Sequence, residues 1–545
     1  MRWYKDAIVY QIYPRSFNDS NGDGIGDIRG IIEKLDYLKD LGINTVWLSP
    51  IYDSPLDDMG YDIRNYCDVL KEYGTLEDFK EMLDGMHRRG IKLIMDLVVN
   101  HTSDEHPWFL EAKKSVDNPY HDYYIFRKGK QGKAPNNWRS FFGGSAWEYN
   151  EATDEYYLHL FSKRQPDLNW ENPKVREEVK KILKFWLDMG VDGFRCDVIN
   201  LLSKKEGLPS TKGLPILSAK GIYIDGPKMH EYLQELKRDV FSKYDMFTVG
   251  ECVLIDHETA LSYVREGVDE LNMVFHFEHM NADCFFSKWL PRKFKLRRLK
   301  APLSKWQYAL QDEGWNSLFL ENHDQPRSVN RFGNLEYRVQ LAKMLAVFIF
   351  SQKGTPYIYQ GQEIGMTNAH YTSIDQYKDV ETLNMYKTLR KFMSEKRAMK
   401  LVKIASRDNS RTPMQWNKAK NAGFSTGEPW LEVNPNYVEI NVEDSLKDED
   451  SILNFYKKYL ALRKNHPIFV HGDYREHYPK SNKIAYYERN FDGKKLLVIC
   501  NFTDKELKFN PIYDLSKFQL LLNNYSEDKD ILLPYQAKIY LGEKA

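Results

Sequence analysis

Short strand-like runs alternate with amphipathic, helix-like stretches over most of the first two thirds of this 545-residue chain. This alternation is typical of βα units wound around a parallel sheet. Eight such units predict a closed (β/α)8 TIM barrel, whose functional side chains lie at the carboxyl ends of the strands. The predicted strands are Ile8–Tyr13, Thr45–Leu48, Lys92–Leu97, Gly193–Cys196, Phe247–Gly250, Met273–His276, Ser317–Leu320 and Pro356–Tyr359, and the predicted helices include Ile28–Leu41, Leu76–Arg89, Pro173–Met189 and Leu341–Ser351.

Two segments depart from this alternation. The segment 102–167 follows the third strand and is long, aromatic and rich in Gly, Asn and Asp, so it predicts an inserted domain that shapes a pocket. Near the end of the chain, strand-like runs at 484–489, 495–502 and 537–541 predict a small antiparallel β-domain. We therefore predict a barrel over 1–101 and 168–465, an inserted domain over 102–167 and a C-terminal β-domain over 466–545.

Composition excludes several classes of partner. Lys+Arg and Asp+Glu both number 78, so no charge bias favours nucleic acid or an anionic membrane. No segment approaches the roughly 20 apolar residues of a membrane span, and the first residues do not read as a secretory leader. An odd number of cysteines without Cys-x-x-Cys spacing favours a reducing compartment. We expect a soluble, cytoplasmic, monomeric protein that acts on a small neutral molecule; its cysteines are Cys67, Cys196, Cys252, Cys284 and Cys500.

Three acidic residues, Asp197, Glu251 and Asp324, occupy the same kind of strand-end position. Retaining hydrolysis of a glycosidic bond needs an ionised carboxylate as nucleophile and a protonated carboxyl as acid, about 5 to 5.5 Å apart. Asp197 is the candidate nucleophile, because Arg195 is expected to keep it ionised and oriented. Glu251 is the candidate acid, since burial would raise its pKa toward a useful range.

The third carboxylate suits a supporting role. Asp324, beside His323, is expected to hold sugar hydroxyls and to stabilise the cationic transition state electrostatically. His101, which ends another strand-like run, could donate to the same sugar. Taken alone, each of these residues is more simply interpreted as a salt-bridged loop residue. Their repetition at matching strand ends favours one shared site.

Six motifs follow one another along the chain. They are Asp96-Leu-Val-Val-Asn-His101, Gln165-Pro-Asp-Leu-Asn-Trp170, Gly193-Phe-Arg-Cys-Asp197, Thr248-Val-Gly-Glu251, Glu321-Asn-His-Asp324 and Gly354-Thr-Pro-Tyr-Ile-Tyr-Gln-Gly-Gln-Glu363. In this order they resemble the motifs of glycoside hydrolase family 13. The resemblance implies the same barrel, an inserted domain B after the third strand and a C-terminal β-domain. It also implies that Asp197 is the nucleophile, Glu251 the acid/base and Asp324 the transition-state stabiliser.

Three further segments are Asn44-Thr-Val-Trp-Leu-Ser-Pro50, Asp57-Asp-Met-Gly-Tyr61-Asp62 and Arg411-Thr-Pro-Met-Gln-Trp416. They resemble the branch of that family that contains oligo-1,6-glucosidase and dextran glucosidase. In that branch the positions of Asp58 and Arg411 form a charged pair that closes the pocket, and the position of Tyr61 stacks under the terminal sugar. Val198, directly after the nucleophile, resembles members that prefer α-1,6 linkages. The resemblance implies an exo-acting, retaining α-glucosidase that releases glucose from isomaltose, panose and similar short oligosaccharides. Domain B aromatics are expected toward the acceptor side, namely Phe141, Phe142, Trp147 and Phe161.

Three alternatives remain open at this level. A sucrose isomerase or trehalulose synthase of the same family would use the same carboxylates, but the segment 297–302 matches the Arg- and Asp-rich loop of those enzymes poorly. A trehalose-6-phosphate hydrolase is a further alternative, although nothing marks a phosphate pocket clearly. A non-catalytic carbohydrate-binding or transporter-ancillary relative would be expected to lack part of the catalytic set, which this chain keeps.

A calcium loop is predicted near the N-terminus. Oxygen-bearing residues alternate there with glycines that permit a tight turn, as a hard cation requires. The loop is not an EF-hand, because its twelfth position is Gly30. A metal-free, Asx-rich turn is the alternative, and no organic cofactor is expected. The family resemblance implies a structural Ca²⁺ bound by Asp19, Asn21, Asp23, the Ile25 carbonyl and Asp27.

Overall fold

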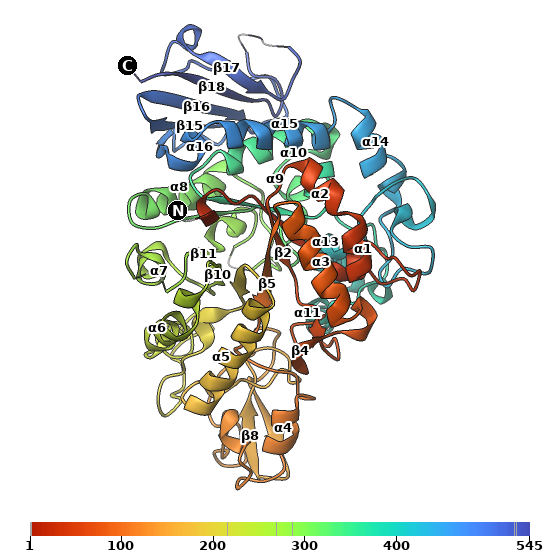
Figure 1. The fold of residues 1–545 in the computed structure, drawn as a ribbon, viewed down its shortest axis with the longest axis vertical. Helices are drawn as coiled ribbons and strands as arrows, with labels where there is room; N and C mark the ends of the chain where they lie inside the picture. Colours follow the sequence, from red (N-terminus) through yellow and green to blue (C-terminus); the bar gives the residue numbers. More distant parts are fainter. Residues whose placement is uncertain are drawn as a thin grey trace.

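A closed barrel of eight parallel strands forms the centre of the computed structural model (Figure 1), which describes residues 3–214, 216–268, 270–285, 287–527, 529 and 531–544. The strand order is β11-β10-β9-β5-β2-β1-β13-β12, and a parallel bridge between Val274 and Asn316 joins the two end strands. The predicted (β/α)8 barrel is therefore confirmed. Its strands are β1 (Val9–Ile12), β2 (Thr45–Leu48), β5 (Lys92–Leu97), β9 (Gly193–Cys196), β10 (Phe247–Glu251), β11 (Met273–Phe275), β12 (Ser317–Leu318) and β13 (Thr355–Tyr359).

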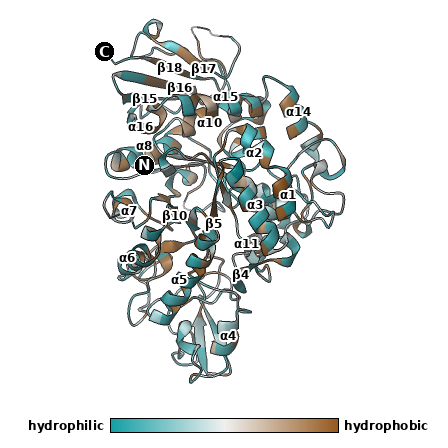
Figure 2. Cartoon of the chain, viewed as in Figure 1, coloured by the Kyte–Doolittle hydropathy of each residue, from teal (hydrophilic) through white to brown (hydrophobic). Residues whose placement is uncertain are grey.

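The barrel strands are buried on both faces because helices surround them, which is why they read as apolar runs rather than as alternating ones. Figure 2 shows strands such as β5 and β10 in brown inside a ring of two-coloured helices. The helices that follow the strands begin with local signals, such as the Thr75–Asp78 capping box before α3 and Asn172 with Pro173 before α5. They are α1 (Ile28–Glu33), α2 (Leu35–Leu41), α3 (Leu76–Arg88), α5 (Pro173–Asp188), α6 (Met229–Asp239), α7 (His257–Val264), α8 (Leu296–Leu310) and α10 (Arg338–Phe350).

Some predicted boundaries differ from the structure. The single helix expected over 28–41 is two helices, because Lys34 leaves helical geometry at φ −106° and ψ 6°. The strand expected over 317–320 is only two residues long. Its remaining residues continue as a loop that carries the Asn-His-Asp motif.

The segment after β5 carries a small three-stranded sheet, at the lower end of Figure 1. Its strands pair antiparallel, and Asp167 ties the segment back to the barrel through Lys204 (2.7 Å) and Asn100 (3.1 Å). We keep the name domain B for this segment. Its elements are α4 (Pro107–Ala112), β6 (Phe126–Arg127), β7 (Trp147–Asn150) and β8 (Glu155–Leu158), and a two-stranded sheet of β3 (Tyr52–Asp53) and β4 (Asn65–Val69) lies earlier in the chain.

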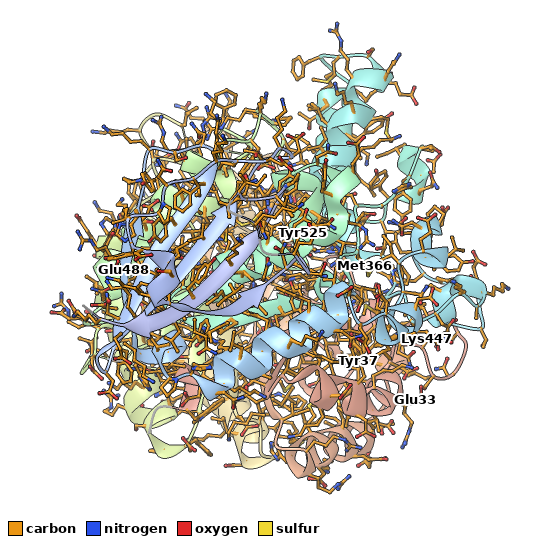
Figure 3. The ribbon with its side chains drawn as sticks, turned by 90° about the horizontal axis from the view of Figure 1, so that it is seen from above. Glu33, Tyr37, Met366, Lys447, Glu488 and Tyr525 are labelled. Carbon is orange, nitrogen blue, oxygen red and sulfur yellow. The ribbon has the colours of Figure 1, made fainter. Side chains whose placement is uncertain are left out.

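A five-stranded antiparallel sheet ends the chain, which confirms the predicted C-terminal β-domain. Figure 3 shows this sheet beside α15 (Ile452–Asn465), with Glu488 on one of its strands. Arg489 fastens the sheet to the barrel by donating to the Ser351 carbonyl at the end of α10 (2.7 Å). The strands are β14 (Asp473–His477), β15 (Ile484–Phe491), β16 (Lys494–Asn501), β17 (Gln519–Asn523) and β18 (Ala537–Glu543).

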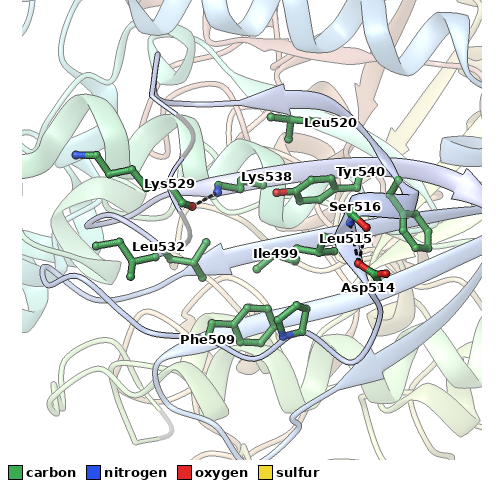
Figure 4. A pocket seen from close by; sticks show the side chains of 13 residues that line it. Ile499, Phe509, Asp514, Leu515, Ser516, Leu520, Lys529, Leu532, Lys538 and Tyr540 are labelled. Carbon is green, nitrogen blue, oxygen red and sulfur yellow. Dashed lines mark hydrogen bonds between the residues drawn. The ribbon is translucent and has the colours of Figure 1, made fainter.

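The outer face of this sheet is covered by loops that leave a cavity of about 500 Å³ (Figure 4). Its walls combine apolar side chains such as Phe509 with polar ones such as Asp514, and Lys538 donates to the Lys529 carbonyl at its edge (3.0 Å). None of the predicted site residues lines this cavity. It belongs to the second, smaller core of the β-domain.

A helical excursion separates β13 from the β-domain. Some residues of this segment return to the carboxyl end of the barrel, where they complete the site described below. The helices of this part are α11 (Val380–Leu389), α12 (Glu395–Ala405), α13 (Asp408–Arg411), α14 (Val442–Lys447), α15 and α16 (Ile468–His471), whereas the short helix α9 (Ser328–Phe332) lies between β12 and β13. Within the described ranges, no helix is long and apolar enough to cross a membrane.

Candidate active site

Arg195 stands at the centre of the site and touches three carboxylates. Its Nη1 binds Asp96 and, at 2.7 Å, Asp197, while its Nη2 binds Glu251. The guanidinium is fully buried, so these charge-assisted bonds act in a medium of low dielectric constant. The expected contact between Arg195 and Asp197 is present, and the same Arg also aligns the candidate acid.

Asp197 and Glu251 also hydrogen-bond to each other. This contact is much closer than the roughly 6.5 to 9.5 Å separation that inverting enzymes need to hold a water between their carboxyl groups. The two residues come from the ends of neighbouring strands, β9 and β10, whose pairing places Cys196 beside Gly250. The geometry therefore favours a retaining double displacement, in which two successive inversions occur at the same carbon.

Burial determines the protonation of this pair. It raises the pKa of Glu251 to about 8 and that of Asp197 to about 7, while the charge of Arg195 opposes both shifts. The hydrogen bond between them lowers the pKa of Asp197 and raises that of Glu251. The shared proton therefore belongs to Glu251, as a nucleophile and an acid require.

The pH dependence of kcat/KM should be bell-shaped as a result. Activity requires ionised Asp197, so it should rise as the pH passes about 7, and it requires protonated Glu251, so it should fall as the pH passes about 8. A profile measured with isomaltose from about pH 4 to about pH 10 checks this expectation. Activity that does not fall on the alkaline side would contradict the role of Glu251.

Asp324 lies among cations. Its Oδ1 is 2.8 Å from Arg411 Nη2 and 3.3 Å from Arg407 Nη1. Burial opposes ionisation, but the guanidinium groups of Arg407 and Arg411 hold the pKa of Asp324 well below its usual range. Asp324 is therefore a fixed negative charge, which suits the stabilisation of a cationic transition state and not proton transfer.

His323 has one preferred tautomer. Its Nδ1 lies 2.8 Å from the Gln11 side-chain nitrogen, which can only donate, so Nδ1 is the acceptor and Nε2 carries the proton. Burial lowers the pKa of His323 to about 3, so the ring is neutral. Nε2 lies 2.8 Å from the Tyr61 hydroxyl and 3.2 Å from Asp324 Oδ2. The Nε2 proton can therefore be donated to the Tyr61 oxygen or to Asp324.

The ion pair of Asp58 corrects the sequence-based expectation. The structure joins Asp58 Oδ1 to Arg407 Nη2 at 2.9 Å, whereas Arg411 instead binds Asp324 and the His323 carbonyl. The expected pair of Asp58 and Arg411 is therefore wrong in detail. Both arginines belong to the same cluster, in which Arg407 also binds Asp379 at 2.6 Å.

Sequence reasoning missed Arg407, although a signal was present. Arg407 and Arg411 are four residues apart, a spacing that places side chains on one face of a helix. The structure shows that Arg407 precedes α13, which ends at Arg411, and both guanidinium groups reach Asp324. Only the fold reveals that this turn returns to the barrel opening, because it lies far beyond Asp324 in the sequence.

Tyr61 and His101 are brought to the same pocket. Tyr61 stacks on His323 with ring centroids 5.3 Å apart and also faces Arg195. His101 Nε2 lies 3.0 Å from the Tyr61 carbonyl, and burial lowers its pKa. Gln165, which the sequence did not single out as a site residue, donates to Asp58 (3.3 Å) and to the Tyr61 carbonyl (3.1 Å), so domain B holds this side of the pocket.

Val198 has a strained backbone directly after the nucleophile. Its φ of 35° and ψ of 42° lie in the left-handed region, which costs a β-branched residue about 1–3 kcal/mol. The side chain is held in a cluster with Leu201 and Tyr223, next to domain B residues such as Trp138. Packing therefore fixes a conformation that turns the chain sharply away from Asp197.

The domain B aromatics occupy different places. Phe161 lies 5.2 Å from the His101 ring and 5.3 Å from Phe141, and Phe142 lies under the Arg407 guanidinium at 5.1 Å. Trp147 is buried and donates to Asn136 (2.7 Å). Phe161 and Phe142 thus lie beside the site residues His101 and Arg407, and Trp147 is a core residue of domain B.

The segment 297–302 does not bear on the isomerase alternative. It forms the first turns of α8 and not a loop at the site, and Arg297 and Lys300 contact the β-domain through Asn482 and Tyr478. The residues of this segment therefore do not distinguish a glucosidase from an isomerase.

The predicted calcium loop has the expected turn. Gly22 and Gly24 have positive φ, and Asp19 accepts backbone hydrogen bonds from Gly22 and Gly24, each at 2.8 Å. Asp27 caps α1, and its pKa is raised by burial and further by the Asp19 charge, so the loop concentrates negative charge that a cation would relieve. Within the described residues, however, no three acidic, His or Cys side chains converge as a metal cluster. Backbone and Asn oxygens would have to supply the remaining ligands.

Strand-end carboxylates on a closed barrel, with an arginine that joins them, define a glycoside hydrolase site. The chain belongs to the α-amylase family: the model described as "Alpha amylase, catalytic domain" matches residues 11–472. It is 56% identical to the oligo-1,6-glucosidase of Parageobacillus thermoglucosidasius over 99% of this chain and 98% of that protein.

Other relatives bear different names. The trehalose-6-phosphate hydrolase of Bacillus subtilis is 47% identical over 99% of this chain and 98% of its own length. A crystal structure of a mutant isomaltulose synthase from Erwinia rhapontici, in complex with sucrose, superposes with a TM-score of 0.96 at 42% identity, covering 99% of both chains. These relatives share one fold but bear different names, so the fold does not identify the acceptor or the linkage. Those two properties have to be inferred from the site.

Proposed function

We propose that this protein is a retaining exo-α-glucosidase that releases glucose from the non-reducing ends of short α-1,6-linked oligosaccharides such as isomaltose and panose. The observation that carries the proposal is the hydrogen-bonded pair of Asp197 and Glu251, with the Asp58–Arg407 ion pair in the same cluster of residues. We infer that this ion pair closes the end of the pocket, so that one terminal sugar fits. The names of four relatives at 50–56% identity support the α-1,6 assignment.

The reaction follows from the protonation states. Asp197 attacks the anomeric carbon while Glu251 transfers its proton to the leaving glycosidic oxygen, which forms a β-glucosyl ester. Glu251, now ionised, removes a proton from water, and the water oxygen attacks the same carbon from the opposite face. Asp197 leaves as a carboxylate, and α-glucose is released with Glu251 protonated again.

Product analysis tests the proposal directly. Isomaltose and panose should give glucose far faster than maltose, sucrose, trehalose or trehalose-6-phosphate, and the first-formed anomer should be α. Isomaltulose or trehalulose made from sucrose would support an isomerase instead. Preferential cleavage of trehalose-6-phosphate would support the hydrolase of that sugar, and no turnover of any substrate would support a carbohydrate-binding role.

Val198→Thr should shift the linkage preference. Thr has nearly the same shape and is also β-branched, so the strained backbone is kept while a hydroxyl enters beside the nucleophile. We expect the ratio of kcat/KM for isomaltose to that for maltose to fall by about tenfold, the scale of one altered contact. An unchanged ratio would show that Val198 does not set linkage. Val198→Ile, which adds no hydroxyl, is the matched control.

We propose a structural Ca²⁺ in the loop of Asp19, Asn21, Asp23, Ile25 and Asp27. The tight turn, with Gly22 and Gly24 at positive φ and their backbone N–H groups donating to Asp19, supports this assignment. Calcium at a concentration about a hundredfold above its Kd should stabilise the EDTA-treated protein by about 2.7 kcal/mol, measured as a rise in Tm. Asp23→Asn should reduce that rise. If the Tm is the same with and without calcium and elemental analysis finds no bound metal, the segment is a metal-free turn.

We also propose that the protein is cytoplasmic and monomeric. The five cysteines are free, and four of them are buried, which suits a reducing compartment. Cell fractionation and sedimentation of the purified protein test these two points.

A further inference from the structure

Trp47, on β2, contacts both the barrel interior and the active site. Its ring stacks on Phe275 (ring centroids 5.5 Å apart) within a cluster of buried side chains from the barrel strands. Its ring also lies 5.9 Å from the His323 ring, and the guanidinium carbon of Arg195 is 5.3 Å from its centre. None of the steps of the proposed reaction involves this side chain.

The indole N–H of Trp47 holds Asp96. Nε1 donates to Asp96 Oδ2 at 2.8 Å, while Oδ1 of the same carboxylate binds Arg195 Nη1. The Tyr61 hydroxyl also lies near Oδ2, but at 3.4 Å it is a weaker donor. Burial raises the pKa of Asp96 to about 6, whereas Arg195 and the Trp47 N–H lower it. The N–H therefore helps to keep Asp96 ionised.

Of the three carboxylates that bind Arg195, only Asp96 keeps its charge through the proposed reaction. Asp197 becomes a neutral ester, and Glu251 loses and regains a proton, so their bonds to the guanidinium change in strength at each step. Arg195 Nε has no partner among the described residues, so it does not fix the guanidinium. A fixed Asp96 can thus keep Arg195 in place while its other two partners change.

We propose that Trp47 is a positioning residue, whose indole N–H fixes Asp96 and thereby keeps Arg195 aligned with the nucleophile and the acid. The inference rests on the proposed glucosidase function, because it needs a reaction in which both of those carboxylates change charge. The alternative is that Trp47 only fills the barrel interior. The two interpretations differ in what the N–H does, since packing needs the ring alone.

Trp47→Phe removes the N–H and keeps an aromatic ring beside Arg195. We expect kcat for isomaltose to fall by about 10- to 100-fold with KM nearly unchanged, because a small misplacement of reacting groups costs up to about 10²-fold. Trp315→Phe is the matched control. Trp315 belongs to the same interior cluster and also donates from its indole, to Thr355 Oγ1 (2.8 Å), but it lies near the amino ends of β12 and β13. Its variant should lower the Tm and keep kcat near that of the wild type.

A double-mutant cycle shows whether Trp47 acts through Asp96. If it does, Trp47→Phe combined with Asp96→Asn should lose no more activity than Asp96→Asn alone. Loss of packing at Trp47 would instead add to the effect of Asp96→Asn.

The pH profile of kcat/KM gives an independent readout. Without the N–H, the pKa of Asp96 rises above its value of about 6, so more of Asp96 is neutral near neutral pH. The charge of Asp96 raises the pKa of Asp197, and it also offsets the charge of Arg195. Both limbs of the profile should therefore move to lower pH in Trp47→Phe and not in Trp315→Phe. The charged and titratable groups around Asp96 are Arg195 and Asp197 at the end of β9, Glu251 on β10, and Tyr52 and Tyr61.

A second variant carries benzothienylalanine in place of Trp47, in which sulfur replaces the indole N–H at nearly unchanged shape. It should show the same loss, and it provides the answer even if Trp47→Phe does not fold. Activity of this variant equal to that of Trp315→Phe, additive losses with Asp96→Asn, or an unshifted pH profile would overturn the positioning role.

An aryl α-glucoside separates this inference from the proposed function, because its cleavage does not depend on the natural linkage. If the wild type cleaves the aryl glucoside but not isomaltose, the proposed linkage is wrong, and the same variants measured with the aryl glucoside support or overturn the role of Trp47. A wild type that cleaves neither substrate would overturn both.

Discussion

Asp197→Asn should lower kcat for isomaltose by about 10⁴-fold or more, since the amide cannot form the glycosyl ester and the first step is lost. The fold should survive, because Arg195 keeps its bonds to Asp96 and Glu251. The measurement is steady-state glucose release, with the Tm as a check on folding. Asp36→Asn, at an exposed position outside the site, is the matched control and should be fully active.

A chemical rescue makes this assignment specific. Asp197→Gly opens space at the anomeric carbon, and azide added with an aryl α-glucoside should yield the β-glucosyl azide by a single displacement. The same product should not form in Asp324→Gly, because Asp324 is not the nucleophile. Substantial hydrolysis of isomaltose by Asp197→Asn, or rescue at Asp324 instead, would contradict the mechanism.

Glu251→Gln should lower kcat/KM for isomaltose by about 10² to 10⁴-fold, the contribution of a positioned general acid. The loss should be much smaller for an aryl glucoside in the bond-breaking step, since a good leaving group needs no proton. Gln does not titrate, so the fall in activity above about pH 8 should vanish. Pre-steady-state bursts of the aryl alcohol, measured across pH, check these expectations.

Equal losses for both substrates would show that Glu251 acts by positioning and not by proton transfer. Asp96→Asn is a useful comparison, because Asp96 also binds Arg195 but does not contact Glu251 in the hydrogen bonds described above. It should reduce activity toward both substrates to a similar degree.

The barrel can be predicted from the sequence because each strand is recognised from residues that are neighbours along the chain. The predicted strands Thr45–Leu48, Lys92–Leu97 and Gly193–Cys196 match the structure to the residue, since these runs are largely apolar and bounded by turns. The strand predicted over 317–320 is longer than β12, because the apolar residues after Leu318 are buried in a loop and not in a strand. Phe319 and Leu320 are buried beside the site as part of a loop.

The site is predictable only where its residues follow a strand. His101, Asp197 and Glu251 do so, and their strand-end position indicates a shared location. The sequence correctly groups Asp58 with an arginine, but the choice between Arg407 and Arg411 depends on how α13 docks against the barrel. Gln165 and Phe142 come from domain B, and no periodicity reveals which of its side chains face the barrel.

By itself, the sequence determined the class of fold and the identity of the chemical groups: eight βα units, with Asp197 and Glu251 at strand ends and Asp324 in the Asn-His-Asp motif. Only the tertiary structure decided how those groups are charged and paired. Desolvation and the hydrogen bond to Asp197 place the proton on Glu251, and the return of α13 supplies Arg407 to Asp58. Strand patterns depend on neighbours along the chain, whereas pKa values and ion pairs depend on distances between segments that lie far apart in the sequence.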